Sequence, residues 1–354
     1  EDSIVLGISS SSKGVNSTVL GNNNKLTGVK NGRNNSIVAG QNLDVEGVHN
    51  AVFGTDYDNY DYKETKVFGE ANTVIGVGNL VGYTAEKDPN DPTKWIYTKK
   101  SSGSDQNVAV GMTNTVNGGS MAFGKNSLVD DLGTSVGYGN EIVGSNDGGG
   151  QRGLALGNRL TVKGEEAVAV GTDASATADW AIAMGKNSKA EKETAMAFGY
   201  DSHAKVAGGV ALGSSSVASV DKGVIGYDAS GTDHSNDTTG VWKSTAAAVS
   251  VGDATGNTKV TRQITNVAAG AADTDAVNVA QLKKAVAGAA DGNDTLVGGS
   301  NGLSLSGKTL SMSVKDTAGN EVKGSVDLSS VADGNDKLVS DNNALSLTGK
   351  TLSM

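Results

Sequence analysis

A glycine recurs every 14 residues through the middle of the chain and ends a short apolar run each time: AVAVG to Gly171, AIAMG to Gly185, AMAFG to Gly199 and GVALG to Gly213. A unit of 14 residues is too short for a helix–turn–helix repeat, but it holds two strands of about five residues and two tight turns. Apolar and small residues alternate before each glycine, as they do in strands. Stacked coils pair each strand in parallel with its copy, so the repeat predicts a β-solenoid, or β-roll.

The same unit reaches toward the N-terminus with one systematic change. Further copies end at Gly7, Gly21, Gly40, Gly54, Gly111, Gly124, Gly137, Gly157 and, after the regular coils, Gly226. The slot two residues before the glycine holds valine in a first block of roughly residues 1–82 (Val5, Val19, Val38, Val52) and mostly alanine in a second block, 108–226 (Ala109, Ala122, Ala155, Ala169, Ala183, Ala197, Ala211). One hypothesis is that this Val/Ala ladder faces partner chains and sets their spacing.

Composition excludes several classes of function. The 354 residues contain 50 Gly but only 4% aromatic residues, which argues against a large conventional core. The absence of Cys excludes disulfides, thiol catalysis and most structural zinc sites, and three scattered His offer little for catalysis. A net charge of −10 without basic clusters argues against nucleic-acid binding. No run of about 18 apolar residues exists, so we expect no membrane-spanning helix.

A single narrow roll of this kind is difficult to stabilise. Both faces of the predicted strands carry apolar or small residues, and a Gly-rich backbone is costly to order. Burial of one face against copies of the same chain offsets that cost at about 25 cal/mol per Å² of apolar area. A closed homotrimer provides this burial without open edges, so we expect a homotrimer.

Three segments interrupt the period and are expected to be loop insertions: residues 55–66, 83–107 and 228–243. The second contains both prolines of the chain and must leave the roll, because proline cannot join a parallel ladder. Loops on a rigid scaffold are common binding sites, and aromatic residues are enriched at binding hot spots. The candidate receptor-contact residues are therefore Trp95, Tyr97, Tyr57 and Tyr60. For Trp95, capping of the roll remains an equal alternative, and for Trp242 a capping or plugging role is preferred.

Two motifs imitate enzyme or metal sites. GLSLSGKT at 302–309 satisfies the phosphate-binding P-loop pattern, which requires a strand before it and a helix after it. Here LSMSV continues as a strand, so we interpret the motif as a turn in a strand repeat. The acidic stretch Asp56–Asp61 lacks the glycine and terminal glutamate of an EF-hand loop, and we interpret it as a solvated loop. We expect no metal and no cofactor.

The coils and the segment after them resemble a known family. Lys186-Asn187-Ser188 and MAFGYDS at 196–202 resemble head repeats of YadA-type trimeric autotransporter adhesins, and RQITNVAAGAADTDAVNVAQLKKA at 262–285 resembles the neck that follows such heads. The resemblance implies a left-handed, trimeric parallel β-roll that binds host matrix or cell surfaces without catalysis. It also implies location at the cell surface, on the outer membrane, through an anchor domain that this chain does not contain.

A short helix is expected after the neck. Asp273 and Asp275 are suited to its start and Lys283 to its end. Val279, Leu282 and Val286 follow the 3-4 spacing of a coiled-coil seam and are the candidate trimerisation residues. Gly288 and Gly292 are expected to end the helix.

The last segment contains a second repeat, since DGNDTLVGGSNGLSLSGKTLSM recurs 42 residues later in similar form. Alternating leucines predict short strands. The expected division is therefore a β-roll head at 1–245, a neck and short coiled coil at 246–290, and a truncated β-rich stalk segment at 291–354. The expected fold class is all-β.

The function predicted from these features is non-catalytic, polyvalent attachment to host tissue or to other cells, with a matrix protein or cell-surface receptor as partner. The alternative is a structural trimeric fibre of a phage or surface appendage without an adhesive role. A polysaccharide-acting β-helix enzyme is a third class, but it needs paired carboxylates facing one groove, and no carboxylate recurs on these ladders.

Overall fold

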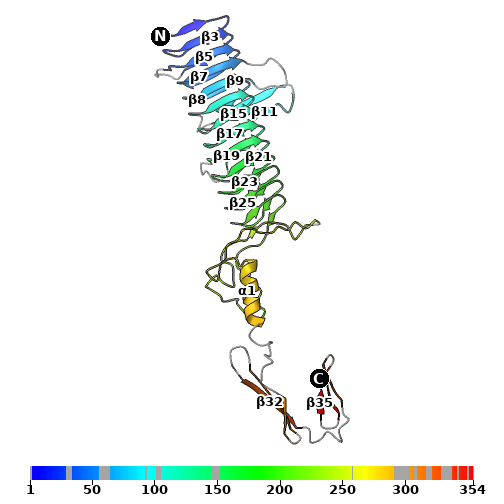
Figure 1. Ribbon diagram of the computed structural model, residues 1–354. Coiled ribbons are helices and arrows are strands. Elements are labelled where there is room, and N and C mark those ends of the chain that lie inside the picture. The colour runs from blue at the N-terminus through cyan, green and yellow to red at the C-terminus, as the bar shows by residue number, and fades with distance from the viewer. Residues whose placement is uncertain are drawn as a thin grey trace. The chain divides into compact units, whose positions relative to one another are not determined.

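A computed structural model describes residues 2–28, 34–55, 64–91, 94–100, 105–144, 152–256 and 258–290, together with six strands between 303 and 353. The chain divides into two compact units, Glu1–Gln263 and Ile264–Met354. The first unit is a stack of coils (Figure 1).

Each coil contributes one strand to each of two parallel sheets. In the described residues the first sheet has 14 strands: β1 (Ile4–Leu6), β3 (Thr18–Asn22), β5 (Ile37–Gln41), β7 (Ala51–Thr55), β9 (Thr73–Val77), β13 (Val108–Met112), β15 (Met121–Lys125), β17 (Thr134–Tyr138), β19 (Leu154–Asn158), β21 (Val168–Thr172), β23 (Ile182–Met184), β25 (Met196–Phe198), β27 (Val210–Leu212) and β29 (Val249–Ser250). The predicted parallel β-roll is confirmed.

The second sheet has 13 strands in the same part of the chain: β2 (Ser11–Ser12), β4 (Lys25–Thr27), β6 (Asp44–Val48), β8 (Lys66–Glu70), β10 (Leu80–Val81), β14 (Thr115–Val116), β16 (Leu128–Val129), β18 (Glu141–Ile142), β20 (Thr161–Val162), β22 (Ser175–Ala176), β24 (Lys189–Ala190), β26 (His203–Ala204) and β28 (Val217–Ala218). Strands of the two sheets alternate along the chain, so each coil touches only its neighbours.

The repeating glycine sets the register of the first sheet. Gly137 pairs with Gly157, and Gly157 pairs with Gly171. Gly157 has a φ of +140°, and a Cβ added to it would lie 1.8 Å from the carbonyl oxygen of Gly171. No other residue fits there without moving the neighbouring coil, which explains why the glycine recurs in the sequence.

The Val/Ala ladder forms the core of the roll. Val19, Val52, Ala122 and Ala169 are fully buried within one chain. The hypothesis that this ladder faces partner chains is therefore wrong. Its side chains point into the narrow interior and join buried apolar residues of the second sheet, such as Leu26. Alternation in sequence predicted two faces for each strand but did not distinguish the inner one, because both are apolar.

A buried polar position closes the turn between the two sheets. The residue three places after the ladder glycine defines this turn slot, and Asn114 occupies it in one coil. Its Nδ2 donates to the carbonyl oxygen of Gly124 at 3.0 Å, and its Oδ1 accepts from the backbone N–H of Ser127 at 3.1 Å. Asparagine thereby satisfies backbone groups of the next coil, as buried polar groups require.

The stack ends differently from the sequence prediction. Gly226 does not start a further coil: β27 pairs with β29, in which Val249 lies beside Val210. Residues 219–248 lie outside both sheets. The guanidinium group of Arg262 then donates to the carbonyl oxygens of Ser214 and Val251, which closes the last coil.

A hairpin lies beside the stack (Figure 1). Its antiparallel strands β11 (Tyr83–Lys87) and β12 (Trp95–Lys99) form a sheet of their own. Because β10 and β14 remain neighbours in the second sheet, the hairpin leaves the roll and returns to it without interrupting the ladder.

The second unit contains helix α1 (Val279–Ala290). Asn278 caps it, not Asp273 or Asp275 as expected. The Oδ1 of Asn278 accepts from the N–H of Gln281 at 2.9 Å, and the Oε1 of Gln281 accepts from the N–H of Asn278 at 3.3 Å, which is a capping box. Asp275 instead accepts from the N–H groups of residues 271 and 272, one turn upstream.

Gly288 does not end the helix, which continues to Ala290, while Gly292 lies outside the described residues. Two antiparallel three-stranded sheets follow: β30 (Leu303–Ser306), β31 (Thr309–Lys315) and β32 (Glu321–Asp327), then β33 (Lys337–Ser340), β34 (Asn343–Thr348) and β35 (Thr351–Ser353). Thr309 begins a strand where a P-loop needs a helix, so the P-loop reading fails. In the described part of the chain, no helix has the length and apolarity to cross a bilayer.

Candidate binding surfaces

The hairpin is fastened to the roll at three points. The hydroxyl oxygen of Tyr97 accepts a hydrogen bond from the backbone N–H of Glu64 at 2.8 Å. Lys99 forms an ion pair with Glu46 of β6, and the Nζ of Lys100 lies 2.8 Å from Asp130 Oδ2. These contacts hold the hairpin in a defined position, so it presents a fixed surface and not a variable loop.

Trp95 and Tyr97, two of the predicted receptor-contact residues, lie on the same face of β12, since they are two residues apart in a strand. Both are half-buried. The Nζ of Lys87 lies 4.3 Å from the centroid of the Trp95 ring, a cation–π contact. Tyr57 and Tyr60 lie outside the described residues. A role of these four residues in receptor contact remains a prediction.

A partly buried cluster of charged residues around Tyr83 escaped the sequence analysis. Burial, together with the negative charges of Asp44 and Glu46, raises the pKa of Tyr83 to about 12. Lys66 lies 3.2 Å from Asp44 Oδ2 and 2.7 Å from a carboxylate oxygen of Glu64. Burial lowers the pKa of Lys66, but these two carboxylates raise it above the usual value. No local pattern marks this cluster, because its members come from separate coils.

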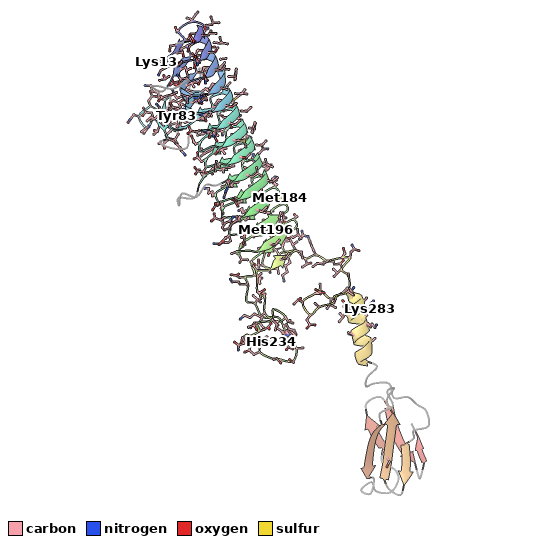
Figure 2. The ribbon with its side chains drawn as sticks, turned by 90° about the vertical axis from the view of Figure 1, so that its left-hand side faces the viewer. Lys13, Tyr83, Met184, Met196, His234 and Lys283 are labelled. Atoms are coloured by element: carbon pink, nitrogen blue, oxygen red, sulfur yellow. The ribbon has the colours of Figure 1, made fainter. Side chains whose placement is uncertain are left out.

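An apolar ladder covers the outer face of the first sheet. It consists of the residue directly before each ladder glycine, and we call it the outer ladder. From β1 to β27 its members stack in register: Leu6, Leu20, Ala39, Phe53, Ile75, Val110, Phe123, Val136, Leu156, Val170, Met184, Phe198 and Leu212. Leu156 is 38% exposed and Met184 41% exposed. Figure 2 labels Met184 on the stack of coils. Contiguous apolar patches of this kind mark interaction surfaces.

The insertion after β28 contains a compact polar loop (Figure 2). The ring of Trp242 stacks on that of His234 at 4.4 Å between centroids. The Nε2 of His234 lies 2.8 Å from Asp228 Oδ2. This hydrogen bond, with further ones from Ser230, lowers the pKa of Asp228 to about 2. Trp242 therefore packs within its own insertion, and its predicted capping role remains a prediction.

The predicted trimerisation residues share one face of α1. Val279, Leu282 and Val286 are 67%, 57% and 59% exposed in the single chain. Their 3-4 spacing places them along one stripe of the helix. An isolated helix of 12 residues is marginally stable, so this apolar stripe is suited to partner helices. Among the described residues, no group of three or more metal-ligating side chains is close enough to hold an ion.

Comparison with known proteins yields family matches to parts of the roll and to the segment that contains α1. The YadA head domain repeat matches residues 1–24, 163–188 and 190–216. The coiled stalk of trimeric autotransporter adhesin matches residues 263–304. The autotransporter adhesin BadA of Bartonella henselae is 56% identical over 63 residues, which is 18% of this chain and 2% of BadA.

Among solved structures, the collagen-binding domain of the Yersinia adhesin YadA is 28% identical and matches over 51% of this chain and 83% of that one, with a TM-score of 0.31. Stacked parallel coils with an apolar ladder on the outer face of one sheet define a repeat-built β-roll. The head repeats and the stalk segment make the chain YadA-like: its coils match the YadA head repeat, and residues 263–304 match the coiled stalk of trimeric autotransporter adhesins.

Proposed function

We propose that this chain is the adhesive part of a homotrimer on the bacterial cell surface, which attaches to host matrix proteins, to host cell receptors or to other bacteria without catalysis. One observation carries the proposal. The coils that match YadA head repeats belong to a roll whose outer ladder is apolar and exposed. In this proposal residues 1–245 are the head, 246–290 the neck and coiled coil, and 291–354 stalk.

Two separate surfaces support the trimer. The outer ladder places 13 apolar residues in register along one sheet, and the apolar stripe on α1 is exposed as well. Each is an open apolar face in one chain, and three-fold association buries both without leaving a free edge. The matched stalk description also names a trimer. Three identical heads convert weak single contacts into avidity.

We propose the hairpin as the receptor-contact element, with Trp95 and Tyr97 in contact, and we propose Tyr57 and Tyr60 of the 55–66 insertion as further contact residues. Its ion pairs and hydrogen bonds fix it on the scaffold, so little conformational entropy is lost on binding. Aromatic residues on a preorganised strand are a common arrangement at binding hot spots.

The test is solid-phase binding of the full chain to collagen, laminin, fibronectin and cultured epithelial cells. Collagen comes first, because the similar YadA structure is that of a collagen-binding domain. We expect saturable binding that falls about tenfold in Trp95→Ala, a loss typical of a hot-spot aromatic. The matched control is Trp180→Asn, which removes an exposed tryptophan from a turn of the roll where φ is 55°. A trimer that binds none of these surfaces would favour the structural fibre.

A further inference from the structure

The end of the hairpin meets the second sheet at a shielded carboxylate. Lys100 directly follows β12, and its backbone N–H donates to the carbonyl oxygen of Gly82, the residue before β11, at 3.0 Å. Its Nζ lies 2.8 Å from Oδ2 of Asp130, which directly follows β16. The side chain of Lys100 is 33% exposed and that of Asp130 only 12%, so little water surrounds this ion pair.

A buried amide shares the same carboxylate. Asn117 directly follows β14, the strand that pairs with β16, and its Nδ2 donates to Asp130 Oδ1 at 2.8 Å. One carboxylate therefore holds a lysine amine and an asparagine amide beside each other. Asn117 is 1% exposed, and within the described chain its Oδ1 has no hydrogen-bond partner. A buried carbonyl oxygen without a donor is unfavourable, so this amide is better satisfied once the acid beside it carries a proton.

The three groups supply a nucleophile, an acyl carbon and an acid–base group. Shielding from water favours transfer of a proton from the Lys100 ammonium to the Asp130 carboxylate, because both groups then lose their charge. The neutral amine is a nucleophile on a flexible stem. A half-turn of the Asn117 amide about its Cβ–Cγ bond lets the protonated carboxyl donate to Oδ1, which polarises the carbonyl for attack.

We propose that Lys100 and Asn117 form an intramolecular amide bond between their side chains, with Asp130 as the acid–base catalyst. The Nζ of Lys100 attacks Cγ of Asn117, and Asp130 gives Oδ1 the proton that it took from the ammonium. Asp130 then carries a proton from the attacking nitrogen to Nδ2, the Cγ–Nδ2 bond breaks, and ammonia leaves as the carbonyl re-forms. The remaining proton goes to the ammonia. One lysine ammonium and one asparagine amide thus become one secondary amide and one ammonium ion, and Asp130 is a carboxylate again.

The bond goes beyond the proposed adhesive function and does not depend on it. It closes a loop from residue 100 to residue 117 and joins the end of β12 covalently to the end of β14. Such a link restricts the unfolded chain, as a disulfide does, in a protein that has no cysteine. It also fixes to the roll the strand that carries Trp95.

The test is high-resolution mass spectrometry of the full chain and of its tryptic peptides. We expect a mass about 17 Da below the value calculated from the sequence, which is the mass of one ammonia. Trypsin cleaves after Lys100 only when the amine is free, and the next basic residue is Lys125. We therefore expect a peptide of residues 100–125 that is about 17 Da light and gives no backbone fragments from between Lys100 and Asn117.

Two variants separate the nucleophile from the acid–base group. Lys100→Arg keeps the positive charge and removes the amine, and Asp130→Asn keeps the shape and removes the carboxyl. We expect both variants to have the full sequence mass. The matched control is Lys99→Arg, because Lys99 is the adjacent residue and also forms an ion pair, with Glu46. It is expected to lose ammonia as the wild type does. Circular dichroism checks that each variant retains the β-rich roll.

Three results would overturn the inference. The first is a wild-type chain of full mass. The second is a loss of about 18 Da, which marks an amide between Lys100 and Asp130 with release of water. The third is a loss of ammonia that persists in Lys100→Arg, which marks attack on Asn117 by the backbone nitrogen of Gly118.

Adhesion to matrix proteins and cells is measured on the same samples. A linked chain that adheres to no surface supports the bond and rejects the proposed function. A chain of full mass that adheres rejects the bond and leaves the proposed function intact.

Discussion

At the scale of single residues, the close approach of neighbouring backbones limits the size of the side chains that the coils can carry. Gly157 lies so near the carbonyl oxygen of Gly171 that its missing side chain is a requirement of the coil spacing. The Ala ladder beside it is equally constrained from the interior, since Ala155 and Ala169 are fully buried between two sheets. Small residues therefore dominate the composition because each coil must fit closely on the next.

The Gly157→Ala substitution is expected to destabilise the roll by about 3 kcal/mol or more. A φ of +140° costs an alanine about 1–3 kcal/mol, and the clash with Gly171 adds to this cost. The thermal midpoint measured by circular dichroism should fall by roughly 6 °C or more. Gly231→Ala is the control, because φ there is +76° but no atom lies within 4 Å of the added Cβ. Equal effects of the two substitutions would contradict the steric argument.

At the scale of elements, the insertions differ from the coils in how they are held together. The loop between β28 and β29 has little apolar core, and hydrogen bonds to carboxylates organise it instead. Asp228 accepts from His234 and Ser230, and Asp237 accepts from the N–H groups of Thr239 and Trp242. Protonation of these carboxylates removes the acceptors, so we expect the loop to be sensitive to acid.

The stacking of Trp242 on His234 is expected to persist at pH 5 and to be lost as the pH falls from about 4 to about 2. The folded-state pKa of Asp228 is depressed to about 2, below the ordinary value of about 3.9. Ionised Asp228 therefore contributes its full share of stability at pH values above the ordinary pKa. This contribution is lost as the pH falls through the folded-state pKa. Two-dimensional NMR of the Trp242 indole N–H reports whether Trp242 remains stacked on His234. Asp228→Asn should shift that signal already at neutral pH, whereas Asp201→Asn, in a distant turn, should not.

The sequence predicted the coils better than it predicted the elements between them. The 14-residue spacing from Gly157 to Gly171 sets strand type and register, because both depend on local periodicity. The inner face was misassigned, since apolar residues lie both inside at Ala169 and outside at Val170. The docking of Tyr97 on Glu64 joins residues 33 positions apart, and no local pattern encodes such a contact. The helix cap was misplaced because several acidic residues before Asn278 were equally suitable.

At the scale of the whole molecule, the outer ladder is the feature that a single chain leaves unsatisfied. Leu156→Asp is expected to weaken the proposed trimer, because three-fold symmetry brings three carboxylates into one apolar layer. Light scattering across a guanidinium series should show that the mass falls from three times 35.6 kDa at a lower denaturant concentration than for the wild type. Leu132→Asp makes the same change at a 53% exposed turn residue and should have no effect. A wild-type chain that is monomeric throughout would reject the trimer.

The pairing of each coil with only the next one has a mechanical consequence. The hydrogen bonds between strands run along the stack, so tension along that direction loads them in series. A terminal coil can then peel away while the rest stays intact, and it releases 14 residues, or roughly 48 Å of extended chain. Under flow, such a roll would lengthen in steps as successive coils unfold. Each step lowers the tension, so the force on a bound receptor contact stays nearly constant.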